Sequence, residues 1–351
     1  MRKCFLLFAA LAMLLAGCGK KAERYSVSFF GAFDTMIQLT AYCESEAEFD
    51  RLSTLAVDSF TRLSRLYDKF QEYEGAVNLC TVNRLAGETP VTVEDELFEL
   101  IAYGLEYSKE IPGVNIAMGS VTSIWQEYLH RYQGAEDGEY PPIGVLTAAA
   151  EHTSPEDVIL DPVRKTVFFR DPELKLDLGA VAKGYATERI GRELYEMGFH
   201  CFCISSGGNI RVFDPAPEKG SHGWSVGVAD PGKSPLDTDA APAASLLVRN
   251  RSVVTSGDYQ RYYIVGGKRV HHIIDPETLF PSGRYRSVTV VCEDSGLADL
   301  LSTALYNLSE AEGAKLASRF GAEAFWIYEG GKTAETDGFA QYRKPSPVAG
   351  D

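Results

Sequence analysis

In the first third of the chain, apolar residues recur every three or four positions over residues 44–67 and 94–109. This spacing places apolar side chains on one face of an α-helix, so both segments are predicted to be amphipathic helices. Residues 27–42 instead alternate between apolar and polar, with a break at Asp34-Thr35. That alternation predicts two strands joined by a turn.

Strand patterns dominate the rest of the chain. Short apolar or alternating runs bounded by Gly, Pro or Asp predict strands at residues 158–160, 166–169, 199–204, 223–228, 244–248, 252–255, 269–274, 287–291 and 324–328. Helical spacing returns at 298–308 and 310–320. Because no strict alternation of strand and helix is present, we expect an α+β fold, a single large domain in which mixed sheets pack against helices.

The stretch 176–189, LDLGAVAKGYATER, combines a strand-like start, a glycine-bracketed turn and helical spacing from Tyr185 onward. The first N–H groups of a helix are unpaired and carry positive potential, which favours anions. Lys183 adds a full positive charge at the same place. The stretch suits a phosphate-bearing ligand; an ordinary strand–turn–helix with a surface lysine is the alternative.

The N-terminus is predicted to be a targeting segment. Arg2 and Lys3 precede an apolar run over residues 4–16, which is too short to span a bilayer comfortably. The run ends in Leu15-Ala16-Gly17-Cys18, which resembles a bacterial lipobox. The resemblance implies a signal peptide over 1–17, a lipidated Cys18 with a tether over 18–28, and a folded domain over 29–345 that is lipid-anchored on the extracytoplasmic face of the cell membrane. A plain signal peptide with a chance cysteine is the alternative.

Charge and cysteine content narrow the possible partners. The 351-residue chain has a formal net charge of −15, so its overall field does not attract nucleic acid or anionic lipid. Any anionic ligand must be met by local positive groups. Of the seven cysteines, those outside the targeting segment show no CxxC pair or zinc-like spacing, and they are predicted to be free thiols: Cys43, Cys80, Cys201, Cys203 and Cys292.

Five separate motifs occur in one order along the chain: DLGAVAKGYA, SSGGNI, TSGDYQRYY, HHIIDPETLFP and ADLLSTALY. Together they resemble the ApbE family of bacterial flavinyltransferases, over about residues 29–342. The resemblance implies a transferase that moves FMN from FAD to a Thr or Ser hydroxyl of an exported acceptor protein. It also implies Mg²⁺ as cofactor and AMP as the released product.

An oxygen-donor set lies on the predicted helix 298–308. Asp299, Ser302 and Thr303 stand at i, i+3 and i+4 and share a face. A carboxylate with hydroxyls suits Mg²⁺, which takes further ligands from phosphates and water. The resemblance assigns Asp299 and Thr303 to the metal, adds Ser302 as a third position, and adds the backbone carbonyl of Ala180. A capping acid with ordinary helix hydroxyls is the alternative.

The resemblance also assigns the contacts with FAD, at Phe33, Tyr73, Val114, Asn115, Asp177, Lys183 and Ile273. The chain departs from the family pattern twice. Phe33-Asp34-Thr35 stands where the family has Met-Gly-Thr, and Val114-Asn115 stands where it has Phe-Asp. An aromatic side chain against a flavin is physically reasonable; an exposed loop tyrosine is the alternative at Tyr73.

His272 matches the histidine of the family's HIIDP pattern and is the candidate catalytic base. A neutral imidazole accepts a proton near pH 7. A structural histidine bonded to Asp275 or to the backbone is the alternative. Ser256 and Asp258 remain open, and Gly207-Gly208 is interpreted as an architectural turn.

Two other functions remain compatible with these motifs. A Mg²⁺-dependent FAD pyrophosphatase needs the same site, with water as the nucleophile. A lipoprotein that only binds and carries flavin needs no metal-binding pair.

Overall fold

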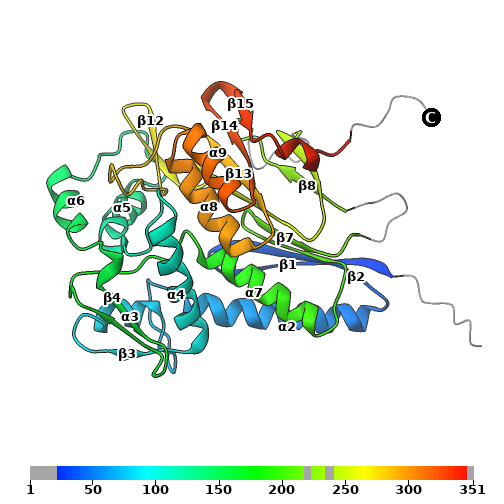
Figure 1. Ribbon diagram of the computed structural model, residues 1–351, viewed down its shortest axis with the longest axis horizontal. Helices are drawn as coiled ribbons and strands as arrows, with labels where there is room; N and C mark the ends of the chain where they lie inside the picture. The colour runs from blue at the N-terminus through cyan, green and yellow to red at the C-terminus, as the bar shows by residue number, and fades with distance from the viewer. Residues whose placement is uncertain (1–21, 217–222, 234–240, 346–351) are drawn as a thin grey trace, which may run out of the picture.

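The computed structural model describes residues 22–216, 223–233 and 241–345, so the predicted signal segment and Cys18 lie outside the described residues. At its centre is an eight-stranded sheet in the order β1-β2-β6-β7-β10-β13-β14-β15 (Figure 1). Its strands are β1 Glu23–Ala32, β2 Thr35–Cys43, β6 Phe202–Ser206, β7 Asn209–Phe213, β10 Ser252–Gly257, β13 Ser287–Cys292, β14 Glu323–Ile327 and β15 Thr333–Glu335.

Helices bury one face of this sheet. Alternate residues of β2, such as Ile37 and Leu39, join the apolar faces of four helices in the main core. These helices are α2 Glu46–Leu66, α4 Asp95–Glu110, α7 Ala182–Glu196 and α8 Ser295–Asn307. The predicted helical segments 44–67 and 94–109 are thereby confirmed as α2 and α4.

The opposite face is covered by a hairpin of β8 Trp224–Val228 and β9 Ala244–Val248, together with η3 Phe339–Tyr342. Trp224 and Leu246 of the hairpin pack with Val253 and Phe325 of the sheet in a second core. Because both faces of the central strands are covered, all six residues of β13 are buried.

A third cluster lies beside the sheet. Trp125 of α5 Gly119–Tyr132 and Leu146 of α6 Ile143–Ala150 pack against the hairpin of β11 Tyr262–Val265 and β12 Lys268–His271. The remaining elements are α3 Leu79–Leu85, β3 Val91–Thr92, η1 Pro155–Asp157, β4 Val158–Asp161, β5 Thr166–Phe169, α9 Glu310–Arg319 and η2 Glu329–Gly331.

The α+β class is confirmed, but the strand directions differ from the expected mixture. Every pair of named strands in the described residues is antiparallel. Between β13 and β14 the reason is visible: two helices, α8 and α9, connect the strands, so the chain returns to the end from which it left. A single crossover helix would have produced a parallel pair.

Three local expectations also change. The segment 176–178 belongs to no strand; beside it, Lys175 forms only an isolated bridge with Met118. Helix α7 begins at Ala182 rather than Tyr185, which puts Lys183 in its first turn. Strand β1 begins at Glu23, so residues 23–28 belong to the sheet rather than to a tether.

All five cysteines of the described residues are free, as predicted. Within those residues no helix is both long and apolar enough to cross a bilayer.

Candidate active site

The first turn of α7 meets α8 around a buried carboxylate. Asp299 is 4 % exposed, and its Oδ2 accepts the Gly184 N–H at 2.8 Å. The helices touch here: a Cβ on Gly184 would lie 2.2 Å from the Ser295 carbonyl oxygen. Burial raises the pKa of Asp299, while the charge of Lys183 and the bond from Gly184 oppose that rise. The fold thus brings Lys183 close enough to Asp299 for its charge to act on the carboxyl.

The Ala180 carbonyl lies just before α7. The helix begins at Ala182 with Val181 as its N-cap, so the Ala180 oxygen stands outside the helical hydrogen-bond ladder. The Gly184 N–H, one of the first-turn donors without a helical acceptor, donates to Asp299.

Ser302 and Thr303 follow Asp299 on α8, but they differ in accessibility. The Ser302 hydroxyl is completely buried; it donates to the Asp299 carbonyl at 3.0 Å and lies 2.7 Å from Ser256 Oγ. Thr303 is half-buried. The two hydroxyls are not equivalent, and Thr303 is the more accessible oxygen donor.

These residues fit one kind of metal ion. In the described part of the chain, no group of three His, Cys, Asp or Glu side chains could hold a metal. One carboxylate with hydroxyl and carbonyl oxygens suits Mg²⁺ when phosphates and waters complete its shell. The donor set fits Mg²⁺ that arrives with a polyphosphate ligand, rather than a metal held by the protein alone.

Asp177 lies in a second polar cluster. Its Oδ2 accepts hydrogen bonds from Lys69 Nζ and Thr122 Oγ1, both at 2.5 Å, and its Oδ1 accepts from the Gly179 N–H at 2.9 Å. Burial alone would raise the pKa of this carboxyl, but the charge and hydrogen bond of Lys69 and the other donors bring it below its ordinary value. Sequence reasoning missed Lys69, because nothing in the linear sequence connects it with a residue 108 positions later.

Phe33 and Tyr73 lie in two different turns. Phe33 has a φ of 54° in the β1–β2 turn, an unusual conformation for phenylalanine. Its ring packs edge-on against Phe60, with centroids 6.4 Å apart. Tyr73 is half-buried in the loop between α2 and α3, where its hydroxyl donates to Asp68 at 2.8 Å. Tyr73 is thus a tethered loop residue, and its contact with a flavin stays a prediction.

Three other predicted FAD contacts are buried or half-buried. Val114 and Ile273 are each 6 % exposed and belong to the main core. The Asn115 side chain is engaged at both ends, donating to the Thr153 carbonyl and accepting from the Ala117 N–H, each at 2.9 Å. These residues can pack beneath a binding surface. Their direct contact with FAD stays a prediction.

The two adjacent histidines have opposite environments. His271 is 2 % exposed; its Nε2 lies 2.7 Å from the Ser282 carbonyl, and its Nδ1 accepts the Ile273 N–H. His272 is exposed by area, yet the protein surrounds it closely enough to disfavour its charged form. That burial, with the neighbouring His271 and the positive charges of Lys183 and Arg261, lowers the pKa of His272 below its ordinary value of 6.5. Because its pKa is lowered from 6.5, His272 is neutral at pH 7.

The residues left open by the motifs are structural. Asp258 is 6 % exposed, and Arg286 Nε donates to both of its oxygens at 2.9 Å. Gly207 has a φ of 55°, and the Thr35 hydroxyl occupies the place where its Cβ would lie. The architectural interpretation of the Gly207 turn is therefore confirmed.

A hollow of about 330 Å³ lies beside the Asp177 cluster. Its lining residues are Lys69, Phe70, Cys80, Asn83, Arg84, Ser123, Gln126 and Lys175. It includes neither Lys183 nor Asp299. The donor set identifies the candidate metal centre better than this hollow does, because no carboxylate lines the hollow.

The α+β fold brings together Lys183, the N-terminus of α7 and the oxygen donors of α8. This combination suits an enzyme that acts on a phosphate-bearing ligand. The chain belongs to the ApbE family, whose model matches residues 33–326. It is 31 % identical over 294 residues to a FAD:protein FMN transferase of Klebsiella pneumoniae, covering 83 % of this chain and 85 % of that protein. A second FAD:protein FMN transferase, from Treponema pallidum, is 31 % identical over 266 residues, which cover 71 % of this chain and 70 % of the relative. The chain is thus an enzyme of the transferase class.

Solved structures share the fold. The ApbE protein of Thermotoga maritima superposes with a TM-score of 0.79 at 24 % identity, covering 92 % of this chain and all of that one. The flavin transferase ApbE of Vibrio cholerae gives a TM-score of 0.74 at 21 % identity, covering 92 % of this chain and 99 % of its own.

Proposed function

We propose that this protein transfers FMN from FAD to a Thr or Ser hydroxyl of an exported acceptor protein, with Mg²⁺ as cofactor and AMP as the released product. The observation that carries the proposal is the contact between the first turn of α7 and Asp299, which brings one cation and one buried carboxylate together. A pyrophosphate with a bound Mg²⁺ needs that combination of charges. The relatives named FAD:protein FMN transferase supply the identity of the substrate.

Asp299, Thr303 and the Ala180 carbonyl are the groups that would hold Mg²⁺, and Ser302 joins α8 to strand β10 through Ser256. When bound, the ion offsets negative charge on the pyrophosphate as a Lewis acid. Lys183 and the first N–H groups of α7 add fixed positive potential at the same place.

In the reaction, the acceptor hydroxyl oxygen forms a bond with the FMN-side phosphorus, and the phosphorus–oxygen bond to AMP breaks. The hydroxyl proton leaves as the new bond forms. His272, neutral at pH 7, has one unprotonated imidazole nitrogen that can accept that proton. Asp258 is a poorer candidate because Arg286 occupies both of its oxygens.

The proposed location is the extracytoplasmic face of the cell membrane, through lipid on Cys18. The support is the Leu15-Ala16-Gly17-Cys18 sequence after a short apolar run. The acidic net charge makes the acyl chains, rather than the protein surface, the source of membrane affinity.

The test is to incubate the full chain, in detergent, with FAD, Mg²⁺ and candidate exported proteins. The proposal predicts a flavin-fluorescent acceptor band after denaturing electrophoresis and one AMP for each flavin attached. Free FMN with AMP and no labelled protein would identify a pyrophosphatase. FAD binding that is unaffected by EDTA and forms no AMP would identify a flavin carrier.

A further inference from the structure

Helices α7 and α8 exchange two reciprocal hydrogen bonds. The Gly184 N–H of α7 donates to Asp299 of α8 at 2.8 Å, and the Ser295 N–H of α8 donates to Glu188 Oε2 of α7 at 2.9 Å. In each helix the donor and the carboxylate are four residues apart and share a face. We call these four residues, Gly184, Glu188, Ser295 and Asp299, the α7–α8 clamp.

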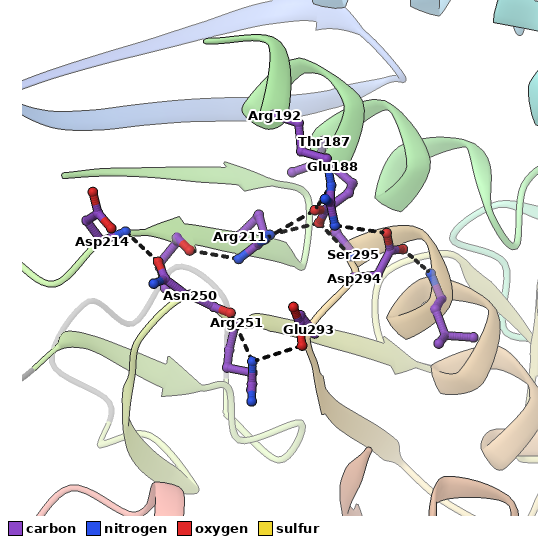
Figure 2. A network of polar contacts seen from close by, with 12 residues as sticks. Thr187, Glu188, Arg192, Arg211, Asp214, Asn250, Arg251, Glu293, Asp294 and Ser295 are labelled. Carbon is purple, nitrogen blue, oxygen red and sulfur yellow. Dashed lines mark hydrogen bonds and ion pairs between the residues drawn. The ribbon is translucent and has the colours of Figure 1, made fainter. Parts of the chain in front are cut away.

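The Glu188 carboxylate is held from a third direction by the central sheet (Figure 2). Arg211 of β7 donates from Nε to Oε2 at 2.7 Å and from Nη2 to Oε1 at 3.2 Å. Arg192 of α7 donates to Oε1 at 2.6 Å. Glu188 and Arg211 are 4 % and 5 % exposed. The carboxylate therefore ties α7, α8 and the sheet to one point and has no freedom to turn elsewhere.

Stability alone does not explain this arrangement. Burying an ion pair costs desolvation energy, and a well-packed apolar pair of similar volume stabilises a fold equally well or better. What an apolar residue at position 188 cannot do is accept the Ser295 N–H. That bond acts on the first residue of α8, one turn before Asp299.

We propose that Glu188 is a positioning residue for Asp299, acting through the Ser295 N–H and the first turn of α8. The inference rests on the proposed function, in which Asp299 holds Mg²⁺. Loss of the Ser295–Glu188 bond leaves the Asp299 carboxylate oriented by the Gly184 N–H and the Asn209 side chain. Outer contacts that orient metal ligands typically change metal affinity by about 10–100-fold.

One position offers a matched pair of substitutions. Ser295 follows the N-cap Asp294, whose φ of −96° and ψ of 131° suit a residue before proline. Proline is favoured at the first helical position and lacks the N–H that Glu188 accepts. Its ring Cδ takes the place of that hydrogen, so the Glu188 oxygen, 2.9 Å from the Ser295 nitrogen, is also displaced. Ser295→Pro therefore removes the clamp bond, whereas Ser295→Ala keeps it and removes a hydroxyl that has no hydrogen-bond partner among the described residues.

The measurement is FAD binding by the full chain, monitored through flavin fluorescence at a series of Mg²⁺ concentrations. We expect Ser295→Pro to raise the Mg²⁺ concentration for half-maximal FAD binding by about 10-fold or more. Ser295→Ala should match the wild type. Equal Mg²⁺ requirements in all three proteins, or an equal shift in both variants, would overturn the proposal.

A second pair decides the question if Ser295→Pro does not fold. Two double variants share Arg211→Met and differ at position 188. Both remove the buried charges, but Glu188→Gln keeps an acceptor for the Ser295 N–H and Glu188→Met does not. The proposal predicts a near wild-type Mg²⁺ requirement for the glutamine pair and a raised one for the methionine pair; equal requirements would overturn it. If FAD binding by the wild type does not depend on Mg²⁺, both the proposed metal site and the clamp role are wrong. A Mg²⁺-dependent wild type with an unaffected Ser295→Pro overturns the clamp role alone.

Discussion

Asn83 holds Leu176 by both of its backbone groups. The Asn83 amide nitrogen donates to the Leu176 carbonyl at 2.9 Å, and the Leu176 N–H donates to Asn83 Oδ1 at 2.7 Å. A side-chain amide thus takes the place of a neighbouring strand. The pairing satisfies the backbone of Leu176 outside any sheet and fixes the position of the adjacent Asp177.

Replacing Asn83 should therefore destabilise the segment that carries Asp177. Asn83→Ala leaves two backbone groups of the buried Leu176 without partners, which should lower the free energy of unfolding by about 2 kcal/mol. Urea denaturation measures this loss. Asn83→Asp keeps the acceptor and should lose less; an unchanged midpoint in Asn83→Ala would mean that water replaces both bonds.

Lys69 should stabilise the protein through Asp177. Lys69→Met leaves a largely buried carboxylate without its cation, at a cost of about 2 kcal/mol, below the roughly 3–5 kcal/mol of a fully buried pair. The folded pKa of Asp177 is depressed, so its stabilising contribution is present above its unfolded pKa and is lost as pH falls through the folded value. The stability difference between wild type and Lys69→Met, measured by denaturation, should shrink below about pH 4. Lys175→Met, which removes a lysine from the wall of the same hollow, serves as the control; a pH-independent difference would argue against the ion pair.

Asp299→Asn should abolish most transfer activity while the fold survives. The asparagine oxygen can still accept the Gly184 N–H, but the one anionic ligand proposed for Mg²⁺ is gone. We expect turnover to fall by orders of magnitude and FAD binding to lose its Mg²⁺ dependence. Thermal melting checks the fold. Equal turnover at saturating FAD, with or without chelator, would remove the metal mechanism.

His272→Ala should slow transfer by roughly 10²–10⁴-fold, the usual contribution of a positioned base, with little change in FAD affinity. Because the pKa of His272 lies below 6.5, the imidazole stays able to accept a proton as pH falls through that value. The wild-type rate should therefore show no acid limb with a midpoint at 6.5. Steady-state rates from pH 5 to 8 test both statements, and an unchanged rate in the variant would make His272 structural.

Cys18→Ser should release the protein from the membrane or leave it unprocessed. The reason is loss of the thiol that the lipobox-like sequence offers for lipidation. Fractionation of cells that express the wild type or the variant measures the change. A variant that is processed and remains with membranes would contradict the anchor.

Short-range patterns were sufficient for much of this protein. The sequence predicted helices α2 and α4 and the free cysteines, because each depends on residues close in sequence or on residue identity alone. The five ordered motifs could be found for the same reason. Periodicity cannot set strand direction, because that depends on how many helices return the chain between strands. The sheet directions therefore differed from the expectation.

The contacts that organise the candidate site were decided by tertiary structure. Lys69 meets Asp177 across 108 positions, Gly184 meets Asp299 across 115, and Ser295 meets Glu188 across 107. The motifs named Asp177 and Asp299 but not the groups that hold them, since no local pattern encodes a partner so distant. Residue types determined which chemistry was available, and only the packing of α7 against α8 determined which oxygen of Asp299 the protein itself occupies.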